Sequence, residues 1–383
     1  MKRKAKNIFE SSKYCYIALK ITNLLFITVK QDEIGKYYAE TTKFDLLRFI
    51  CGILVGIWYI FDNSGSKLGD SQRAIIFEIA LFLCSKYEYV MPFCVMTGTF
   101  YYRFEYFKII KNLNWIDQIL LKNFIHRNHS HDLYWSAMIS NGNLFYATFC
   151  SVTAYTFVHI TGIRYQNFPI ENAFFFVVLS IPEAFLITNV LAIVAVYLRI
   201  KSIKKFISNR SSKNIDEVCR KINLSMKFRN KIYETFISLN KFFSLNSCIH
   251  YLAIVLAFVL WFLSTYDFVK NNSSIESYSV FIFTVSGYII IASSIVSVTL
   301  AFQTLTNNLE IEICKEIECI QKDFCCEKIH KQVQLALLQV YHLPLKSSCG
   351  LITFDWKIWL TILSAAMSNI MICLQFDMSG LIN

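Results

Sequence analysis

Charged residues, proline and glycine are all scarce in this chain of 383 residues. Asp, Glu, Lys and Arg together make up 17% of the sequence, against about 25% in a typical soluble domain. The four prolines and 11 glycines argue against long flexible linkers or disordered tails. The shortage of charge excludes an ordinary soluble domain and directs attention to the hydrophobic residues, which make up 55% of the chain.

The apolar residues occur in blocks rather than in amphipathic stripes. About 20 consecutive apolar residues suffice to span the hydrocarbon layer of a membrane. Blocks of this kind predict an all-α polytopic membrane protein with seven transmembrane helices. The predicted spans are 44–61, 73–101, 133–161, 170–198, 246–266, 277–302 and 356–376. A shorter block at 15–29, interrupted by Lys20, is interpreted as an interfacial or buried helix.

The basic residues lie almost entirely on one side of these predicted spans. Residues 1–43 and the loops 102–132, 199–245 and 303–355 carry 31 Lys and Arg, whereas the opposite loops carry three. Because basic loops stay in the cytosol, the N-terminus is predicted to be cytosolic and the C-terminus extracellular. G-protein-coupled receptors have an extracellular N-terminus, so the charge distribution argues against that class. The net charge of +11 is attributed to these loops rather than to nucleic-acid binding.

Two cytosolic segments are predicted to be amphipathic helices that continue the neighbouring spans. Apolar residues recur at helical spacing in both, and charged residues occupy the other faces. In the first segment these residues are Ile203, Phe206, Ile207, Ile222, Phe228, Ile232 and Phe236. In the second segment they are Leu305, Leu309, Ile313, Ile317, Ile320 and Phe324. Because such stripes have to pack against something, we expect a shared helical bundle beneath the membrane.

No catalytic, metal-binding or cofactor-binding pattern is evident in the sequence. The run Cys314, Cys319, Cys325 and Cys326 lacks the CxxC spacing of a zinc site. No group of His, Cys and Glu has the spacing of an active site, so we expect neither an enzyme nor a cofactor. The basic start MKRKAK is followed by polar residues, so no cleavable signal peptide is expected.

The last predicted span has no charge between Lys357 and Asp377, yet it contains several polar side chains. Those that share one helical face are Thr361, Ser364, Ser368 and Gln375, with Met371 in the gap. Unpaired hydroxyl and amide groups are costly in lipid, so this face should meet protein or water. Two interpretations remain open: close helix packing through small and hydroxyl residues, or the water-contacting wall of a conduction path.

The segment LLQVYHLPLKSSCGLITFDWKIW precedes that span, and the span ends in Gln375-Phe376. The positions that carry a family similarity are Gln339, His342, Pro344, Cys349, Gly350, Phe354 and Asp355. Together they resemble the C-terminal signature of insect gustatory receptors, a family related to the insect odorant receptors. The family pattern is Thr-Tyr, five hydrophobic residues and Gln-Phe. This chain has Ser368-Asn369 in place of Thr-Tyr, which keeps a hydroxyl but loses the tyrosine ring.

The resemblance implies a taste receptor of the plasma membrane that acts as a ligand-gated, non-selective cation channel. Four identical or related subunits would assemble in the lipid, and a small-molecule tastant, which we expect to be bitter or another non-sugar compound, would open the pore. The regions implied are an N-terminal cytosolic segment (1–43), a six-helix ligand-binding region (44–302), cytosolic anchor helices (303–355) and a pore-lining helix (356–383). The pore residues implied are Ser364, Ser368, Met371, Ile372, Gln375, Phe376 and Asp377, with Gln375 and Phe376 at the gate.

The ligand pocket of the family opens outward between the outer halves of the second to sixth spans. In this chain the residues expected there are Tyr155, Thr156, His159, Phe175, Glu183, Trp261, Thr284 and Tyr288. An aromatic cavity with a few polar groups suits a small organic molecule. Ordinary helix packing, or a place in the interfacial aromatic belt, is the alternative interpretation for these residues.

Lys86 and Glu183 are predicted to lie near the middle of the membrane, where a charge is costly and should pair or face water. We therefore expect an ion pair of Lys86 with Glu88 or with Glu183. Buried charges of this kind also occur in secondary transporters, which remain an alternative function, although the two halves of the chain show no internal similarity. A seven-helix receptor that signals through G proteins is the other alternative.

Overall fold

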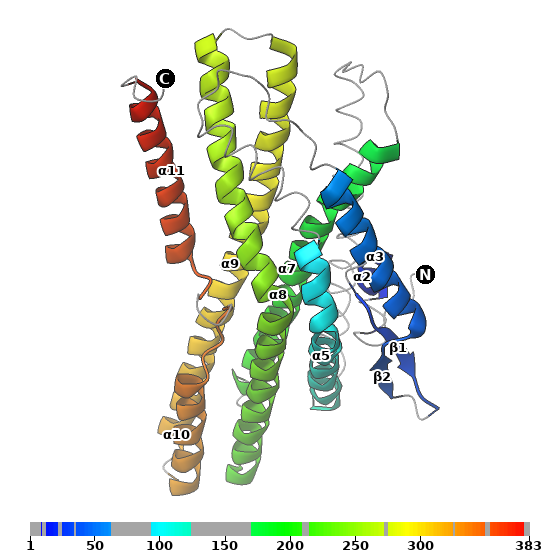
Figure 1. Cartoon of the computed structure of the whole chain (residues 1–383). Coiled ribbons are helices and arrows are strands. Elements are labelled where there is room, and N and C mark those ends of the chain that lie inside the picture. The colour runs from blue at the N-terminus through cyan, green and yellow to red at the C-terminus, as the bar shows by residue number, and fades with distance from the viewer. Residues whose placement is uncertain are drawn as a thin grey trace, which may run out of the picture.

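The chain folds into long helices that run roughly parallel along an elongated molecule (Figure 1). The computed structural model describes residues 9, 13–21, 25–33, 36–62, 93–123, 170–208, 214–271, 275–324, 326–348 and 353–378. A short helix, α2 (Lys13–Ile21), leads into an antiparallel hairpin of β1 (Thr28–Gln31) and β2 (Tyr37–Glu40). The remaining helices are α3 (Lys43–Asp62), α5 (Arg103–Asn123), α7 (Ile170–Ser208), α8 (Ile215–Asn271), α9 (Ile275–Asp323), α10 (Glu327–His342) and α11 (Trp356–Met378).

Five of the predicted spans coincide with helices: 44–61, 170–198, 246–266, 277–302 and 356–376. The span at 133–161 lies outside the described residues, as does most of the span at 73–101. Within the described residues, Phe185–Ser208 is long and apolar enough to cross a bilayer, and Ile215–Phe243 with Ser247–Val259 passes the same test as a pair bent by 55°. The continuation of α7, α8 and α9 as helices beyond their predicted spans is confirmed. The seven-helix count and the orientation stay predictions.

The predicted helix at 15–29 is wrong in its second half. Helix α2 ends at Ile21, and Thr28 already belongs to β1, which pairs with β2. The apolar residues between them, Leu25, Phe26 and Ile27, are fully buried in a segment without regular secondary structure. A short apolar run does not distinguish a buried helix from a buried extended segment, and the β-branched residues at its end favour the strand.

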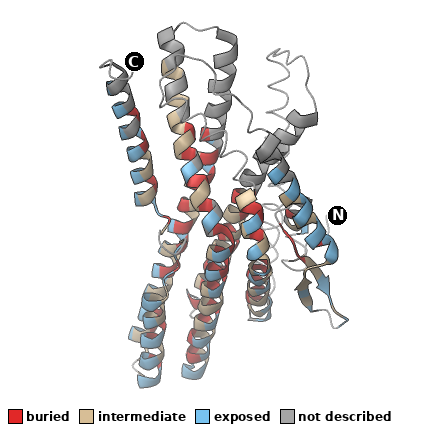
Figure 2. Cartoon of the chain, viewed as in Figure 1, coloured by how far each residue is buried: buried red, intermediate tan, exposed pale blue. Residues whose placement is uncertain are grey.

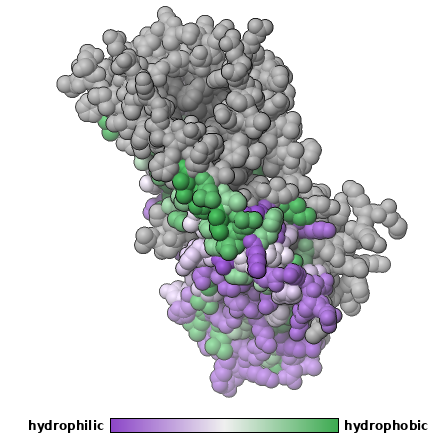
Figure 3. All heavy atoms as spheres, turned by 45° about the vertical axis from the view of Figure 1, so that its right-hand side comes forward, coloured by the Kyte–Doolittle hydropathy of each residue, from purple (hydrophilic) through white to green (hydrophobic). Residues whose placement is uncertain are grey.

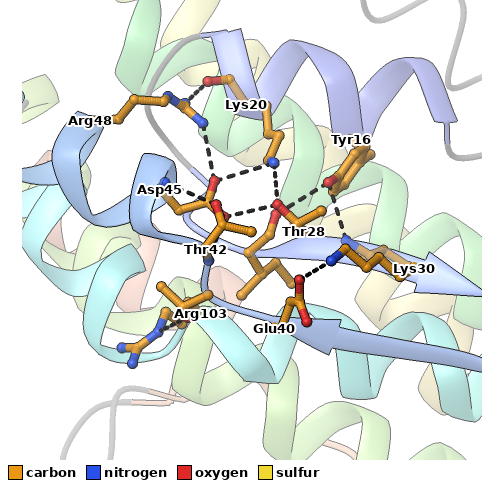
Figure 4. Close-up of polar contacts among 12 residues, drawn as sticks. Tyr16, Lys20, Thr28, Lys30, Glu40, Thr42, Asp45, Arg48 and Arg103 are labelled. Atoms are coloured by element: carbon orange, nitrogen blue, oxygen red, sulfur yellow. Dashed lines mark hydrogen bonds and ion pairs between the residues drawn. The ribbon is translucent and has the colours of Figure 1, made fainter.

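The start of α3 is tied to the N-terminal elements through Asp45 (Figure 4). Thr42 and Asp45 form a capping box, because each side chain accepts a hydrogen bond from the backbone N–H of the other, at 3.2 and 3.1 Å. The fully buried Asp45 carboxylate also accepts the Thr28 hydroxyl at 2.9 Å and lies 3.2 Å from Lys20 Nζ and 3.5 Å from Arg48 Nη1. One carboxylate therefore holds α2, β1 and α3 together.

The main hydrophobic core lies where α5, α7, α8, α9 and α10 pack together, and Figure 2 shows stretches of buried residues along these long helices. All seven apolar residues predicted for the first cytosolic stripe belong to this core and are at most 8% exposed. The second stripe is confirmed in part: Leu309, Ile313, Ile317, Ile320 and Phe324 are buried or packed against the core. Figure 3 shows hydrophilic side chains covering this end of the molecule, next to a hydrophobic band.

Leu305 is 44% exposed, so its predicted place in the bundle is wrong. The inner face of α9 at this level carries polar residues instead, namely Gln303, Thr306 and Glu310, which are all buried. Thr306 donates its hydroxyl to the carbonyl of Phe302, and Glu310 is paired with an arginine of α8. A hydropathy pattern cannot identify an inner face that carries polar residues such as Glu310, whose partner lies on another helix.

Arg199 of α7 and Asp117 of α5 form a deeply buried ion pair in this core. The guanidinium donates Nε to Oδ1 at 3.1 Å and Nη2 to Oδ2 at 2.7 Å, and both side chains are 4% exposed. Arg199 also donates Nη1 to the carbonyl of Ala195 at 2.9 Å. A two-point contact of this kind fixes the relative position of two helices more narrowly than apolar packing does.

We expect the substitution Arg199→Met to destabilise the protein by about 3–5 kcal/mol, because it removes the arginine that forms a two-point ion pair with the buried Asp117 carboxylate. The exposed pair Lys204–Glu312 also joins two helices, at 2.6 Å, so Lys204→Met serves as the matched control. That control should cost about 0–1 kcal/mol. Thermal unfolding of the detergent-solubilised protein measures both, and equal losses in the two variants would contradict the structural role of the buried pair.

Candidate functional site

Helix α11 has one face against the rest of the chain and one face that no other described residue covers. Trp359, Ala366 and Ile370 lie on the packed face and are at most 4% exposed. The predicted pore residues Ser364, Ser368, Met371, Ile372 and Gln375 are all exposed, as is Thr361. The polar stripe predicted from spacing therefore lies on the uncovered side of α11. Phe376 and Asp377 belong to the same helix, but their side chains lie outside the described residues.

The exposure of the stripe bears on the two interpretations that the sequence left open. Hydroxyl groups that packed against other helices of the same chain would be buried, whereas Ser364 and Ser368 are exposed. Thr361 satisfies its hydroxyl within its own helix, by donating to the Lys357 carbonyl at 2.8 Å. Packing within the described part of this chain thus does not account for the stripe.

The base of α11 is held by aromatic contacts with α8. Tyr251 stacks on Phe354 with ring centroids 5.0 Å apart, and Trp359 meets the same tyrosine edge-on at 5.4 Å. These rings form a second hydrophobic cluster, together with Ile254 of α8 and apolar residues of α9. Figure 1 shows α11 at the margin of the molecule, with its lower end next to the other helices. The cluster therefore fixes one end of α11 and leaves its outer face open.

The segment between α10 and α11 folds back on itself. The Phe354 N–H donates to the Ser347 carbonyl at 2.8 Å, and Ser348 pairs with Thr353 in an antiparallel bridge. At the end of this segment the Asp355 carboxylate accepts the N–H of Ile358 at 2.8 Å and so caps the N-terminus of α11. Asp355 belongs to the family signature, and this cap gives it a physical role.

The sequence did not predict an ion pair that lies next to the C-terminal end of α10. Arg229 of α8 donates Nε to Glu310 of α9 at 2.7 Å and donates Nη2 to the carbonyl of Leu343, just after α10. Burial raises the pKa of the Glu310 carboxyl above its ordinary value, although the nearby Arg229 acts in the opposite direction. The only signal in the sequence was an arginine within an apolar helical stripe. A cavity of about 40 Å³ adjoins the pair and is otherwise lined mainly by apolar side chains.

The structure leaves most of the predicted ligand pocket untested. Tyr155, Thr156 and His159 lie outside the described residues, as do Lys86 and Glu88. Phe175 and Glu183 belong to α7, and Thr284 and Tyr288 belong to α9, but nothing is described of these four side chains. Trp261 of α8 is half-buried, and its indole Nε1 is buried without a hydrogen-bond partner among the described residues.

No group of three or more His, Cys, Asp and Glu side chains within the described residues is placed to hold a metal ion. Of the cysteine run singled out in the sequence, Cys314 is half-buried on α9, and burial raises the pKa of its thiol to about 11. The thiolate is the form that binds metals and attacks disulfides, and the raised pKa disfavours the thiolate of Cys314 near neutral pH.

The aromatic cluster predicts unequal effects for two tryptophans on α11. We expect Trp359→Ala to cost about 3–5 kcal/mol, because Trp359 is 4% exposed among other rings. Trp356 lies one turn earlier and is 39% exposed, so Trp356→Ala should cost much less. Thermal unfolding of the solubilised protein compares the two variants. A loss for Trp356→Ala as large as that for Trp359→Ala would be inconsistent with this packing.

Comparison with known proteins gives a consistent result for the whole chain. A family model described as 7tm Chemosensory receptor matches residues 42–380. The structure of the insect olfactory receptor OR5 from Machilis hrabei shares the fold with a TM-score of 0.64 at 11% sequence identity, covering 95% of this chain and 97% of that chain. The structure of that receptor in complex with eugenol gives the same TM-score and coverage at 12% identity.

No curated protein shows significant sequence similarity to the chain. The family model nonetheless spans most of the chain, and the C-terminal motif pointed to the same family. The odorant-receptor fold extends over almost the full length of both compared chains. This protein therefore belongs to the insect chemosensory receptor family.

Proposed function

We propose that this protein is a ligand-gated, non-selective cation channel of the plasma membrane and that the α11 helices of four subunits line its pore. The observation that carries the proposal is the uncovered face of α11, where Ser364, Ser368 and Gln375 are exposed. One helical face cannot enclose a pore, so several copies of α11 have to meet around it. Hydroxyl and amide groups can then replace part of the hydration of a passing ion. Membership of the chemosensory receptor family supports the same function.

We propose that the channel has seven membrane-spanning helices and a cytosolic N-terminus. The 31 basic residues that lie on one side of the predicted spans support the orientation. In that orientation the shared core of α5, α7, α8, α9 and α10 lies in the cytosol, and the C-terminal end of α11 lies outside. Gln375 and Phe376 would then form the gate near the outer end of the pore, and Asp377 would favour cations there.

The cytosolic helix α10 is suited to hold subunits together. Its inner face packs in the core through Ile329, Val333 and Ala336, which are buried. Its outer face also carries large apolar side chains, of which Leu338 is 51% and Tyr341 is 81% exposed. A helix in the cytosol that is apolar on two sides indicates a second packing partner. We assign that partner to α10 or a neighbouring helix of another subunit.

A small organic molecule is the proposed activator. The similar receptor from Machilis hrabei has been solved in complex with eugenol, which supports a small-molecule ligand for this chain as well. The indole Nε1 of Trp261, which has no hydrogen-bond partner in the described part of the chain, offers a donor to such a ligand from α8. We propose a tastant, and among tastants a bitter or other non-sugar compound. A screen of plant alkaloids and phenols for evoked cation current, with the chain expressed alone and with related subunits, would identify it.

The pore predicts that the substitution Gln375→Cys creates a thiol that a charged, water-soluble methanethiosulfonate reagent can reach. The buried position Ile370, 1% exposed on the packed face, provides the matched control Ile370→Cys. Modification at position 375 should reduce the cation current, whereas the unsubstituted chain, with its 13 native cysteines, should keep its current under the same reagent. If position 375 stays inaccessible both at rest and during stimulation, α11 does not line a water-filled pore.

The assembly predicts that Leu338→Asp weakens the tetramer, because it places a charge in an apolar contact between subunits. Leu338→Met keeps the apolar character and should leave the assembly intact. Light scattering coupled to size exclusion, on protein solubilised in mild detergent, should give the mass of a tetramer for Leu338→Met and of smaller species for Leu338→Asp. A tetramer of unchanged stability in Leu338→Asp would remove α10 from the interface.

A further inference from the structure

One helix, α8, holds the segment before α11 at three successive levels. At the lowest level Arg229 donates to the carbonyl of Leu343, directly after α10. At the highest level Tyr251 stacks on Phe354, at the entrance to α11. Between them lies Asn240, which contacts the middle of the segment through two hydrogen bonds.

Asn240 binds two backbone groups of the segment at once. Its Nδ2 donates to the Lys346 carbonyl at 2.8 Å, and its Oδ1 accepts the Ser348 N–H at 3.2 Å. A side-chain amide carries one acceptor and a donor group, as a peptide group does, so it can pair with backbone like a strand neighbour. Neither aspartate nor alanine can form both bonds. Both hydrogen bonds therefore depend on the side-chain amide of Asn240.

The three holding residues are regularly spaced along α8. Arg229, Asn240 and Tyr251 follow one another at intervals of eleven residues. Eleven residues correspond to three helical turns plus about 20°, so Arg229 and Asn240 start from nearly the same face of α8. Between Asn240 and Tyr251 the helix bends by 55°. The segment before α11 is thus attached to α8 on both sides of this bend.

Asn240 also lies between two buried anchors of this segment. Leu345, on one side, is 2% exposed and belongs to the main core, whereas Phe354, on the other side, belongs to the second cluster. The apolar anchors fix the surfaces on which the segment packs, but apolar contacts still allow the segment to shift along α8. The two hydrogen bonds of Asn240 oppose such a shift, because hydrogen bonds weaken steeply as distance and angle change.

We propose that Asn240 is a positioning residue for the pore helix, which sets where α11 begins relative to α8 and thereby stabilises the closed pore. This inference rests on the proposed channel function. Helix α8 continues from Asn240 through the predicted span at 246–266, which carries the candidate ligand residue Trp261. A movement of α8 on ligand binding therefore reaches α11 through the attachment at position 240.

The test uses the full-length chain carrying Gln375→Cys and needs no activating ligand. Three variants are compared in that background: Asn240→Ala, which removes both hydrogen bonds; Asn240→Asp, which keeps only the acceptor for Ser348; and Asn223→Ala. Asn223 is an exposed asparagine of the same helix, so it serves as the matched control. The first readout is the rate at which the charged methanethiosulfonate reagent modifies position 375 at rest. The second is backbone hydrogen exchange at Ser348.

We expect Asn240→Ala, which removes both hydrogen bonds, to speed modification by about 4- to 100-fold, since each bond of typical net strength corresponds to about 2- to 10-fold. Asn240→Asp should show a smaller increase, and Asn223→Ala should show none. Exchange at Ser348 should rise in Asn240→Ala and stay closer to the unsubstituted rate in Asn240→Asp. Asn240 is half-buried at the protein surface, so its loss should leave the fold intact.

Three results would overturn the inference in different ways. Faster exchange at Ser348 with an unchanged rate of modification at position 375 would mean that Asn240 only stabilises the segment locally, and the proposed pore would remain. No modification at position 375 in any background would overturn the proposed pore and this inference together. Equal exchange at Ser348 in all variants would mean that the two hydrogen bonds do not hold the segment.

Discussion

Hydroxyl and amide side chains on a membrane helix have to meet water or a polar partner, because lipid offers neither. This constraint governs α11, whose polar stripe faces away from the described remainder of the chain. Ser364, Ser368 and Gln375 are not covered by the described part of one subunit. In the proposed tetramer these side chains would meet water between the subunits, so the proposed channel and the proposed assembly rest on the same energetic argument.

The helical core formed by α5, α7, α8, α9 and α10 gives α11 a fixed base. Two buried ion pairs, Arg199–Asp117 and Arg229–Glu310, connect helices that apolar side chains alone would hold less specifically. Buried pairs of this kind add little net stability compared with apolar packing, but a register shift that separates the partners is strongly unfavourable. The core thus behaves as a rigid support, and the segment before α11 is attached to it along α8.

The N-terminal elements are also held together by a buried charged group and its partners. The Asp45 carboxylate is fully buried, yet it is surrounded by the Thr28 and Thr42 hydroxyls and by the cationic groups of Lys20 and Arg48. Thr42 and Arg48 lie within three residues of Asp45, whereas Thr28 and Lys20 come from β1 and α2, and their contacts with Asp45 could not be assigned from spacing in the chain. The buried carboxylate favours this arrangement of α2, β1 and α3 because a buried charge is costly without such partners.

The sequence by itself determined the features that depend on local periodicity and on composition. It predicted the helical class, the bounds of α3 and α11, the buried stripe around Phe228 and Ile232, and the polar face of α11, because these follow from side-chain spacing along a single helix. The C-terminal motif also identified the family. Only the tertiary structure decided the strand at Thr28, the polar inner face of α9 and the attachment of the α10–α11 segment to Asn240. Those features depend on partners distant in sequence, and a polar residue becomes a favourable core residue only when its partner is brought within hydrogen-bond distance.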